Sequence, residues 1–174
     1  MFTPFLEDGF EIAKALGVEF YHAGSKKHPI SLEERRDMYS RWITGTHEGL
    51  VASTLAAGND YAHVRIAAHL GNPHEMVTFV QQSGRAGRGG KPALSILIPK
   101  GKRVQNNVDN DDDESADLCG KQAMDEYIWP EDPELPYCLQ KIMSRFLDTG
   151  SSYTCDSFGL ESELCGMCTE GEKQ

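Results

Sequence analysis

The sequence predicts an α/β fold in which a parallel β-sheet is flanked by helices, with a small helical appendage. Short apolar runs bounded by turn signals recur at 18–21, 50–53, 64–70 and 93–98. Such runs are typical of parallel strands that are buried on both faces. Segments with helical spacing separate them, and this alternation indicates layers of helix and sheet. At 174 residues, the chain is long enough for one full domain and an appendage.

Two helices in the first half have clear boundary signals. Apolar residues at helical spacing predict a helix over 7–16, and Gly17 provides the stop. The run Ser-Leu-Glu-Glu at 31–34 fits a capping box, which opens a second helix through Trp42. Gly45 is expected to end that helix.

The first strand of the sheet is expected to be short. Only residues 1–3 precede Pro4, whereas a central strand normally needs more residues. We therefore expect an upstream half of the protein outside this chain, although an alternative start would explain the same pattern. A third helix is predicted over 75–82, after Pro73.

Composition divides the chain into three parts. Residues 1–104 carry the alternating strands and helices. Residues 105–117 are rich in Asp and Glu, which is typical of a solvated linker, and we favour this interpretation over a metal site. Residues 118–174 form a smaller helical part, with a proline-rich elbow at 129–133 and an amphipathic helix predicted over 135–147.

The net charge of -10 conceals a basic stretch. No acidic residue lies between 76 and 108, and this stretch contains Arg85, Arg88, Lys91, Lys100, Lys102 and Arg103. A basic patch is compatible with nucleic-acid binding despite the overall negative sign. The first residues lack the features of a signal peptide, and no apolar run reaches membrane-spanning length. We therefore expect an intracellular protein without a membrane partner.

The most specific motif lies at 81–88 and reads Gln-Gln-Ser-Gly-Arg-Ala-Gly-Arg. The planar guanidinium of arginine binds two phosphate oxygens at once, and small neighbours let the backbone turn close to a ligand. A basic, glycine-rich surface turn is the alternative, but the complete pattern is rarer than such turns. It resembles motif VI of superfamily 2 helicases, whose arginines contact ATP held by a partner lobe. Gly89 follows the motif, where RecQ-type proteins usually have aspartate.

An upstream segment, 51–65, resembles motif V of RecQ-type helicases. A strand ends there in small residues and turns through Gly58 before Asp60. This pattern places the Thr54 hydroxyl at the carboxyl edge of the sheet, where α/β folds bind ligands. His69 follows at the distance usual in that family. The match therefore indicates a RecQ-like superfamily 2 DNA helicase.

The resemblance to RecQ-type helicases covers nearly the whole chain. The stretch Phe-Tyr-His-Ala-Gly at 20–24, with the helix after it, is similar to a stretch of the family. Within it, His22 is a candidate for contact with a DNA strand, although an isolated histidine of this kind is more often structural.

Four cysteines in the last part have the number and spacing of zinc ligands: Cys138, Cys155, Cys165 and Cys168. A Cys-x-x-Cys pair with two further thiols satisfies tetrahedral Zn²⁺, and in an intracellular chain metal is favoured over disulfides. Four free thiols are the alternative. RecQ helicases carry a four-cysteine zinc module after the motor, so the resemblance supports the same set. Cys119 lies outside the spacing and is interpreted as an ordinary thiol.

The resemblance implies the C-terminal RecA-like lobe, a P-loop NTPase-like fold, of a 3'-5' DNA helicase that serves DNA repair and recombination in the nucleus. ATP with Mg²⁺ would lie between this lobe and an N-terminal ATP-binding lobe, and the DNA partner would be a junction of single strand and duplex. The implied roles are catalytic for Arg85, Arg88 and Gln81, nucleotide-binding for Asp60, Gly58 and Gly84, and DNA-binding for Thr54, His22 and Lys91.

The motifs of the other motor lobe are not in this sequence. It contains no Gly-x-x-x-x-Gly-Lys-Ser/Thr loop and no Asp-Glu-x-His box, which ATP needs for its phosphates and for Mg²⁺. We therefore expect the N-terminal lobe to be missing from this chain and the chain alone to be inactive. Two alternatives stay open: a non-enzymatic, zinc-containing fragment that binds DNA or a protein, and the lobe of an RNA helicase.

Overall fold

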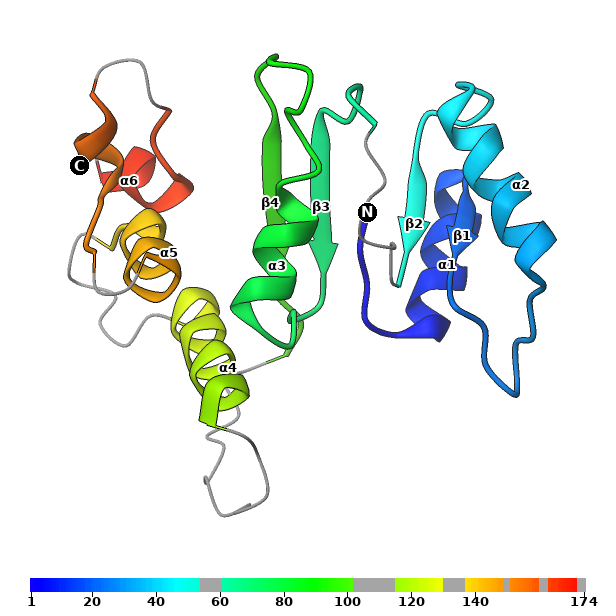
Figure 1. Ribbon diagram of the computed structural model, residues 1–174, viewed down its shortest axis with the longest axis horizontal. Coiled ribbons are helices and arrows are strands. Elements are labelled where there is room, and N and C mark those ends of the chain that lie inside the picture. The colour runs from blue at the N-terminus through cyan, green and yellow to red at the C-terminus, as the bar shows by residue number, and fades with distance from the viewer. Residues whose placement is uncertain (54–60, 102–114, 130–136, 149–150, 160–162, 172–174) are drawn as a thin grey trace. The chain divides into compact units, whose positions relative to one another are not determined.

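The computed structural model describes residues 1–53, 61–101, 115–129, 137–148, 151–159 and 163–171, without the side chains of 115–117 and 170–171 (Figure 1). The chain divides into two compact units. Unit 1 comprises Met1–Pro73 and Val80–Gly101. Unit 2 comprises His74–Phe79 and Lys102–Gln174.

All strand pairs of unit 1 are parallel. Strand β1 (Glu19–Tyr21) pairs with β2 (Leu50–Ala52), and β3 (Ile66–Leu70) pairs with β4 (Leu94–Ile98). Because these strands are apolar and joined by helical crossovers, parallel pairing is the expected outcome. The prediction of helices combined with parallel strands is thus confirmed.

Residues 1–3 lie between the two strand pairs. Phe2 forms parallel bridges to Ala52 of β2 and to His69 of β3. The Thr3 amide donates to the Ala52 carbonyl at 3.0 Å, and the Leu70 amide donates to the Phe2 carbonyl at 2.9 Å. The parallel segments therefore follow the order β1, β2, residues 1–3, β3, β4, with a very short central member.

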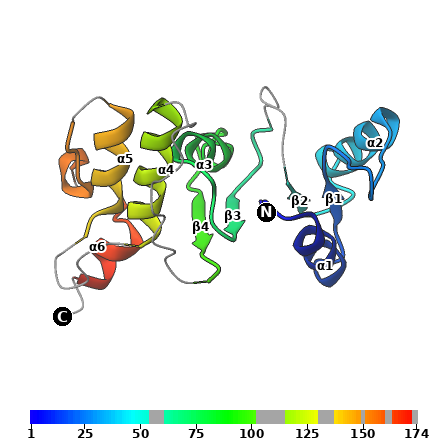
Figure 2. The ribbon, with the colours of Figure 1, turned by 90° about the horizontal axis from the view of Figure 1, so that it is seen from below.

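Helices α1 (Leu6–Leu16) and α2 (Leu32–Ile43) lie on opposite faces of β1 and β2 (Figure 2). The αL residue Gly17 ends α1 with a φ of 66°, as predicted. At the start of α2, the Ser31 hydroxyl accepts from the Glu34 amide at 3.1 Å, and the Glu34 carboxylate accepts from the Ser31 amide at 2.8 Å. This reciprocal pair is the predicted capping box.

The core of unit 1 contains an aromatic ring packed against the backbone of α1. Phe20, Ala13 and Val51 form one buried cluster between α1 and the strands. Gly9 of α1 faces the Phe20 ring so closely that a Cβ atom there would lie 2.2 Å from the ring. A glycine at this position lets the aromatic ring pack against the helix backbone.

Helix α3 (Met76–Ser83) contributes its first residues to unit 2 and its last to unit 1. It covers the predicted range 75–82 to within one residue at each end. Within the described ranges, none of the helices combines the length and the apolar character needed to span a bilayer.

Unit 2 contains α4 (Ser115–Ile128), α5 (Leu139–Leu147), a 3₁₀ turn η1 (Cys155–Phe158) and α6 (Gly166–Gly171). Two hydrogen bonds join α4 to the chain around α5: Tyr137 donates its hydroxyl to the Glu126 carbonyl at 3.0 Å, and Arg145 pairs with the Glu126 carboxylate. Helix α4 begins inside the segment predicted as linker. Helix α5 begins at Leu139, later than the predicted 135, and 135–136 lie outside the described residues.

Candidate functional site

The motif at 81–88 forms the end of α3 and the turn that follows it. The Gly84 amide donates to the Val80 carbonyl at 2.8 Å, which continues the helical pattern past Ser83. Gly87 has a φ of 81°, a conformation that favours glycine, and its amide donates to the Val64 carbonyl at 3.0 Å. Because Val64 lies two residues before the start of β3 at Ile66, the turn is attached to the amino-terminal edge of the parallel strands.

The two arginines of the turn differ in exposure. Arg85 is only 8% exposed, whereas Arg88 is exposed and donates Nε–H to the Gly84 carbonyl at 3.2 Å. Burial lowers the pKa of Arg85, and the charge of Arg88 lowers it further. The Arg85 guanidinium nevertheless stays charged at neutral pH, because arginine is not deprotonated in proteins. The turn thus presents one exposed and one enclosed cation.

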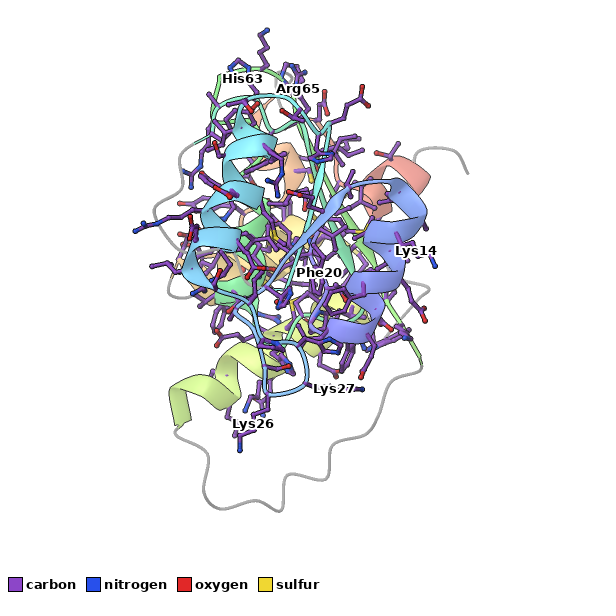
Figure 3. All side chains as sticks on the ribbon, turned by 90° about the vertical axis from the view of Figure 1, so that its right-hand side faces the viewer. Lys14, Phe20, Lys26, Lys27, His63 and Arg65 are labelled. Carbon is purple, nitrogen blue, oxygen red and sulfur yellow. The ribbon has the colours of Figure 1, made fainter. Side chains whose placement is uncertain are left out.

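Arg85 lines a cavity of about 470 Å³ in unit 1. Trp42 from the end of α2 and Tyr61 and His63 from the segment before β3 form its aromatic wall. The ring centroids of Trp42 and Tyr61 are 4.9 Å apart, and those of Tyr61 and His63 are 5.3 Å apart. Figure 3 labels His63 together with Arg65, which lines the same cavity. Sequence reasoning missed this wall, because its members lie on segments 20 residues apart without a shared motif.

A buried histidine connects the end of α3 to the sheet. His69 is 2% exposed, and its Nε2–H donates to the Gln82 side-chain oxygen at 3.1 Å. Its ring stacks on Phe2 with centroids 5.1 Å apart. Burial lowers the pKa of His69 to about 4, so the ring is neutral at pH 7. Gln81, which the sequence singled out, is exposed at the surface of α3.

Gly89 fits tightly against the segment before β3. A Cβ atom at this position would lie 2.7 Å from the Ala62 carbonyl oxygen. Real Cβ atoms do not come this close to a carbonyl oxygen, so the backbone would have to shift to accept a side chain. Glycine at position 89, where the sequence resemblance would lead one to expect aspartate, therefore fits the close packing against the Ala62 carbonyl.

Other predicted site residues are placed less centrally or lie outside the described range. Thr54, Gly58 and Asp60 belong to residues that the structure does not describe. Lys91 is exposed in the turn between α3 and β4. His22 is 4% exposed, and its Nδ1 accepts from the Gly24 amide at 3.1 Å. The His22 ring thus has a structural partner, and its contact with DNA stays a prediction.

The four predicted zinc ligands lie together in unit 2. The sulfur atoms of Cys138, Cys155, Cys165 and Cys168 are all within 4.8 Å of one another. They come from the start of α5, from η1 and from both sides of the start of α6. Cys119 is exposed, and it is not among the four. The structure therefore brings together the four residues that the spacing selected.

The cluster has the geometry and the chemistry of a tetrahedral thiolate site. With Zn–S bonds of about 2.3 Å, tetrahedral ligands have sulfur atoms about 3.8 Å apart. The Sγ atoms of Cys138 and Cys155 are 3.6 Å apart. Backbone amides also point at the sulfurs: Cys155 N–H donates to Cys138 Sγ at 3.3 Å, and Cys165 N–H donates to Cys155 Sγ at 3.2 Å. Such bonds stabilise thiolates. The residues fit Zn²⁺.

The thiols themselves do not share one protonation state. Burial raises the pKa of Cys155 to about 11 and also raises the pKa of Cys168. Burial pushes the pKa of Cys165 up as well, but hydrogen bonds from the backbone of Cys168 and Leu139 bring it down to about 7. Binding of a cation by four thiolates would release the protons that the cysteine sulfurs still carry, as happens in structural zinc sites.

Comparisons with known proteins point to one group of helicases. No protein-family model matches the chain. ATP-dependent DNA helicase Q4 of Mus musculus is 34% identical over 116 residues, which is 64% of this chain and 9% of that protein. ATP-dependent DNA helicase RecQ of Bacillus subtilis (strain 168) is 25% identical over 157 residues, which is 86% of this chain and 24% of that protein. The bifunctional 3'-5' exonuclease/ATP-dependent helicase WRN of Mus musculus is 36% identical over 84 residues, 48% of this chain and 6% of that protein.

Among solved structures, Mycobacterium smegmatis helicase Lhr bound to ssDNA and AMP-PNP is similar, with a TM-score of 0.43 and 22% identity over 67% of this chain and 14% of that chain. The sequence matches show that the chain is homologous, over part of its length, to RecQ-family ATP-dependent DNA helicases, which confirms the resemblance seen in the motifs. The chain spans about a tenth to a quarter of the length of the first two relatives, Q4 and RecQ.

Proposed function

We propose that unit 1 is the C-terminal RecA-like motor lobe of a RecQ-like, 3'-5' DNA helicase and that unit 2 is its zinc-binding subdomain. One observation carries the proposal. The turn after α3 presents Arg85 and Arg88 at one edge of a parallel sheet, in a chain homologous to RecQ-type ATP-dependent helicases. Paired arginines at a sheet edge suit the phosphates of a nucleotide.

The difference in exposure between Arg88 and Arg85 suggests that the two side chains have different roles. Arg88 is exposed, so it would contact the γ-phosphate of ATP held by an N-terminal ATP-binding lobe. Arg85 is buried and lines the cavity, so it would contribute a fixed positive charge behind Arg88. Gln81, exposed on the last turn of α3, would couple this site to the DNA.

The remaining assignments extend the same proposal. Asp60 and Gly58 would contact the ribose side of the nucleotide, with Mg²⁺ on the phosphates, and Gly84 would let the chain approach them. Thr54 and Lys91 would contact the DNA backbone at a junction of single strand and duplex, as an electrostatic contact that weakens with salt. Such a protein would serve DNA repair and recombination in the nucleus.

Zinc would be a structural component of unit 2. Cys138, Cys155, Cys165 and Cys168 would hold the ion, which supplies folding stability and no redox chemistry. The four ligands come from three separate elements, so the bound ion would fix α5, η1 and α6 to one another.

The test joins this chain to a RecQ-type ATP-binding lobe and measures DNA-stimulated ATP hydrolysis and strand separation. The joined protein should be active, whereas the chain alone should hydrolyse no ATP. Arg88→Ala should lower the turnover by about 10³–10⁵-fold, the usual cost of losing an arginine finger. Arg36→Ala, at an exposed position of α2, is the matched control and should keep full activity. Turnover that Arg88→Ala and Arg85→Ala both leave intact would contradict the proposal.

A non-enzymatic role is the second candidate, because the sequence contains no phosphate loop of its own. In that case the chain would bind DNA without turnover, even when an ATP-binding lobe is supplied. Binding that weakens steeply with salt, combined with inactivity of the joined protein, would favour it. A higher affinity for RNA than for DNA would instead favour an RNA helicase lobe.

A further inference from the structure

The cavity beside Arg85 has a lining that combines aromatic rings with fixed positive charge. Its volume of about 470 Å³ falls within the range of about 300–1,000 Å³ typical of small-ligand sites. Trp42 and Tyr61 supply the rings, and Arg65 and Arg85 supply the charges. Glu48 is the one carboxylate among its described lining residues, so the lining carries a positive balance.

This combination selects for a particular ligand chemistry. A bare phosphate would leave the aromatic wall of the cavity empty, and a purely apolar ligand would make no use of the charges of Arg65 and Arg85. A nucleotide unit offers both a flat base and an anionic phosphate, and aromatic side chains bind bases of any sequence by their π-faces. Arginine is well suited to the phosphate.

We propose that this cavity binds one nucleotide unit, with the base against Trp42 and Tyr61 and the phosphate toward Arg85. The unit would come either from a free mononucleotide or from a nucleic-acid strand, since both have the same base and phosphate. The inference rests on the proposed function only in that both place the positive charge of Arg85 near a phosphate. It adds a site for the base, formed by Trp42, which lies outside the helicase motifs described above, and by Tyr61, to which those motifs gave no role.

The arrangement of the wall supports a site for a flat ligand. Trp42 and Tyr61 meet edge to face, with an angle of 61° between their planes and centroids 4.9 Å apart. His63 extends the wall at 5.3 Å from Tyr61, and its side chain is exposed. Arg65, which lines the same cavity, donates its Nε–H to the Pro92 carbonyl at 2.8 Å. The rings of Trp42, Tyr61 and His63 thus pack in sequence along the cavity.

Trp42 itself provides the measurement. The chain has two tryptophans, so Trp129→Phe leaves Trp42 as the single reporter. The fluorescence of this variant is titrated separately with AMP, with a dT oligonucleotide and with inorganic phosphate. We expect a saturable change with AMP, with the oligonucleotide or with both, which also tells which source fills the cavity. No change with either, or the same change with inorganic phosphate alone, would overturn the proposal.

Variants of the wall separate stacking from general effects. Tyr61→Ala should weaken nucleotide binding by about 10-fold or more, the usual effect of losing one base–aromatic contact. Tyr61→Phe, which keeps the ring, should bind within about 2-fold of the parent. Tyr153→Ala, at an exposed tyrosine of unit 2, is the control and should change nothing. If Tyr61→Ala does not fold, His63→Ala replaces it, because that side chain is exposed.

Equal losses in the Tyr61→Ala and Tyr153→Ala variants would overturn the inference, as would an unchanged affinity in both Tyr61→Ala and His63→Ala. The titration uses no second lobe and reads no turnover. Its failure would leave the helicase proposal standing, and an inactive joined protein that still shows the Trp42 signal would leave the cavity proposal standing.

Discussion

Removal of one cysteine from the cluster should unfold unit 2. The four sulfurs lie within 4.8 Å of one another, a spacing that fits the one Zn²⁺ proposed above. Structural zinc contributes about 10–16 kcal/mol of apparent binding free energy at pH 7. Whole domains have a net stability of only about 5–15 kcal/mol. Because Cys155 is buried and its sulfur accepts a hydrogen bond from the Cys165 amide, its loss should remove more free energy than the small core of unit 2 can replace.

The assay counts zinc and reactive thiols in the same sample. The parent chain should contain one zinc per chain, and of its five cysteines only Cys119 should react quickly with a thiol reagent. Cys155→Ala should lose the metal, expose the remaining thiols and lose helical signal. Cys119→Ala is the matched control and should keep both the zinc and the fold. A parent protein that is folded, metal-free and fully thiol-reactive would refute the reasoning.

Three further predictions concern unit 1. Gly9→Ala should destabilise the protein by about 1–2 kcal/mol, because overpacking against Phe20 exceeds the gain of about 1 kcal/mol in helix propensity; urea unfolding measures it. Gly89→Asp should lower Tm and the Arg88-dependent ATPase of the joined protein, because its Cβ would meet the Ala62 carbonyl. Stability should fall as pH drops from about 6.5 toward 4, because the pKa of His69 is lowered to about 4 in the folded state.

Each of these outcomes has its own check. For Gly9, the destabilisation should shrink when Phe20→Leu is combined with it, and strict additivity would contradict the packing explanation. For Gly89, an unchanged Tm would contradict the close approach to the Ala62 carbonyl. For His69, protonation favours the unfolded state, where the pKa of the ring is about 6.5. The contribution of the neutral ring to the free energy of unfolding is therefore complete above that pH and is lost as the pH falls toward the folded-state pKa of about 4. His69→Phe should therefore flatten the pH dependence of the unfolding free energy measured between pH 7 and 5.

Local signals in the sequence predicted the end of α1 and the start of α2. Gly17 and the Ser31 capping box act through neighbouring backbone groups, so their effect does not depend on distant residues. The start of α4 was not found, because its first residues continue an acidic run whose composition is typical of a linker. Composition describes an average property, whereas a helix end depends on particular positions.

The candidate site was predictable only in part for the same reason. The spacing of the four cysteines identified the cluster, because ligand number and type are properties of the sequence. Arg85 is buried and lines the same cavity as Trp42 and Tyr61, an arrangement of distant segments that no motif encodes. The roles of Thr54 and Asp60 stay predictions.

The hydrogen bond between His69 and Gln82 constrains the chemistry of its neighbourhood. Both groups are uncharged at neutral pH, and the amide oxygen accepts the imidazole proton without an ion forming inside the protein. Spontaneous deamidation, which turns glutamine into glutamate, would put a carboxylate beside the buried ring and draw a second proton onto it. The desolvated ion pair so created would be costly to bury. Deamidation of Gln82 would thus disturb the end of α3, where the turn with Arg85 and Arg88 begins, although neither arginine would have changed.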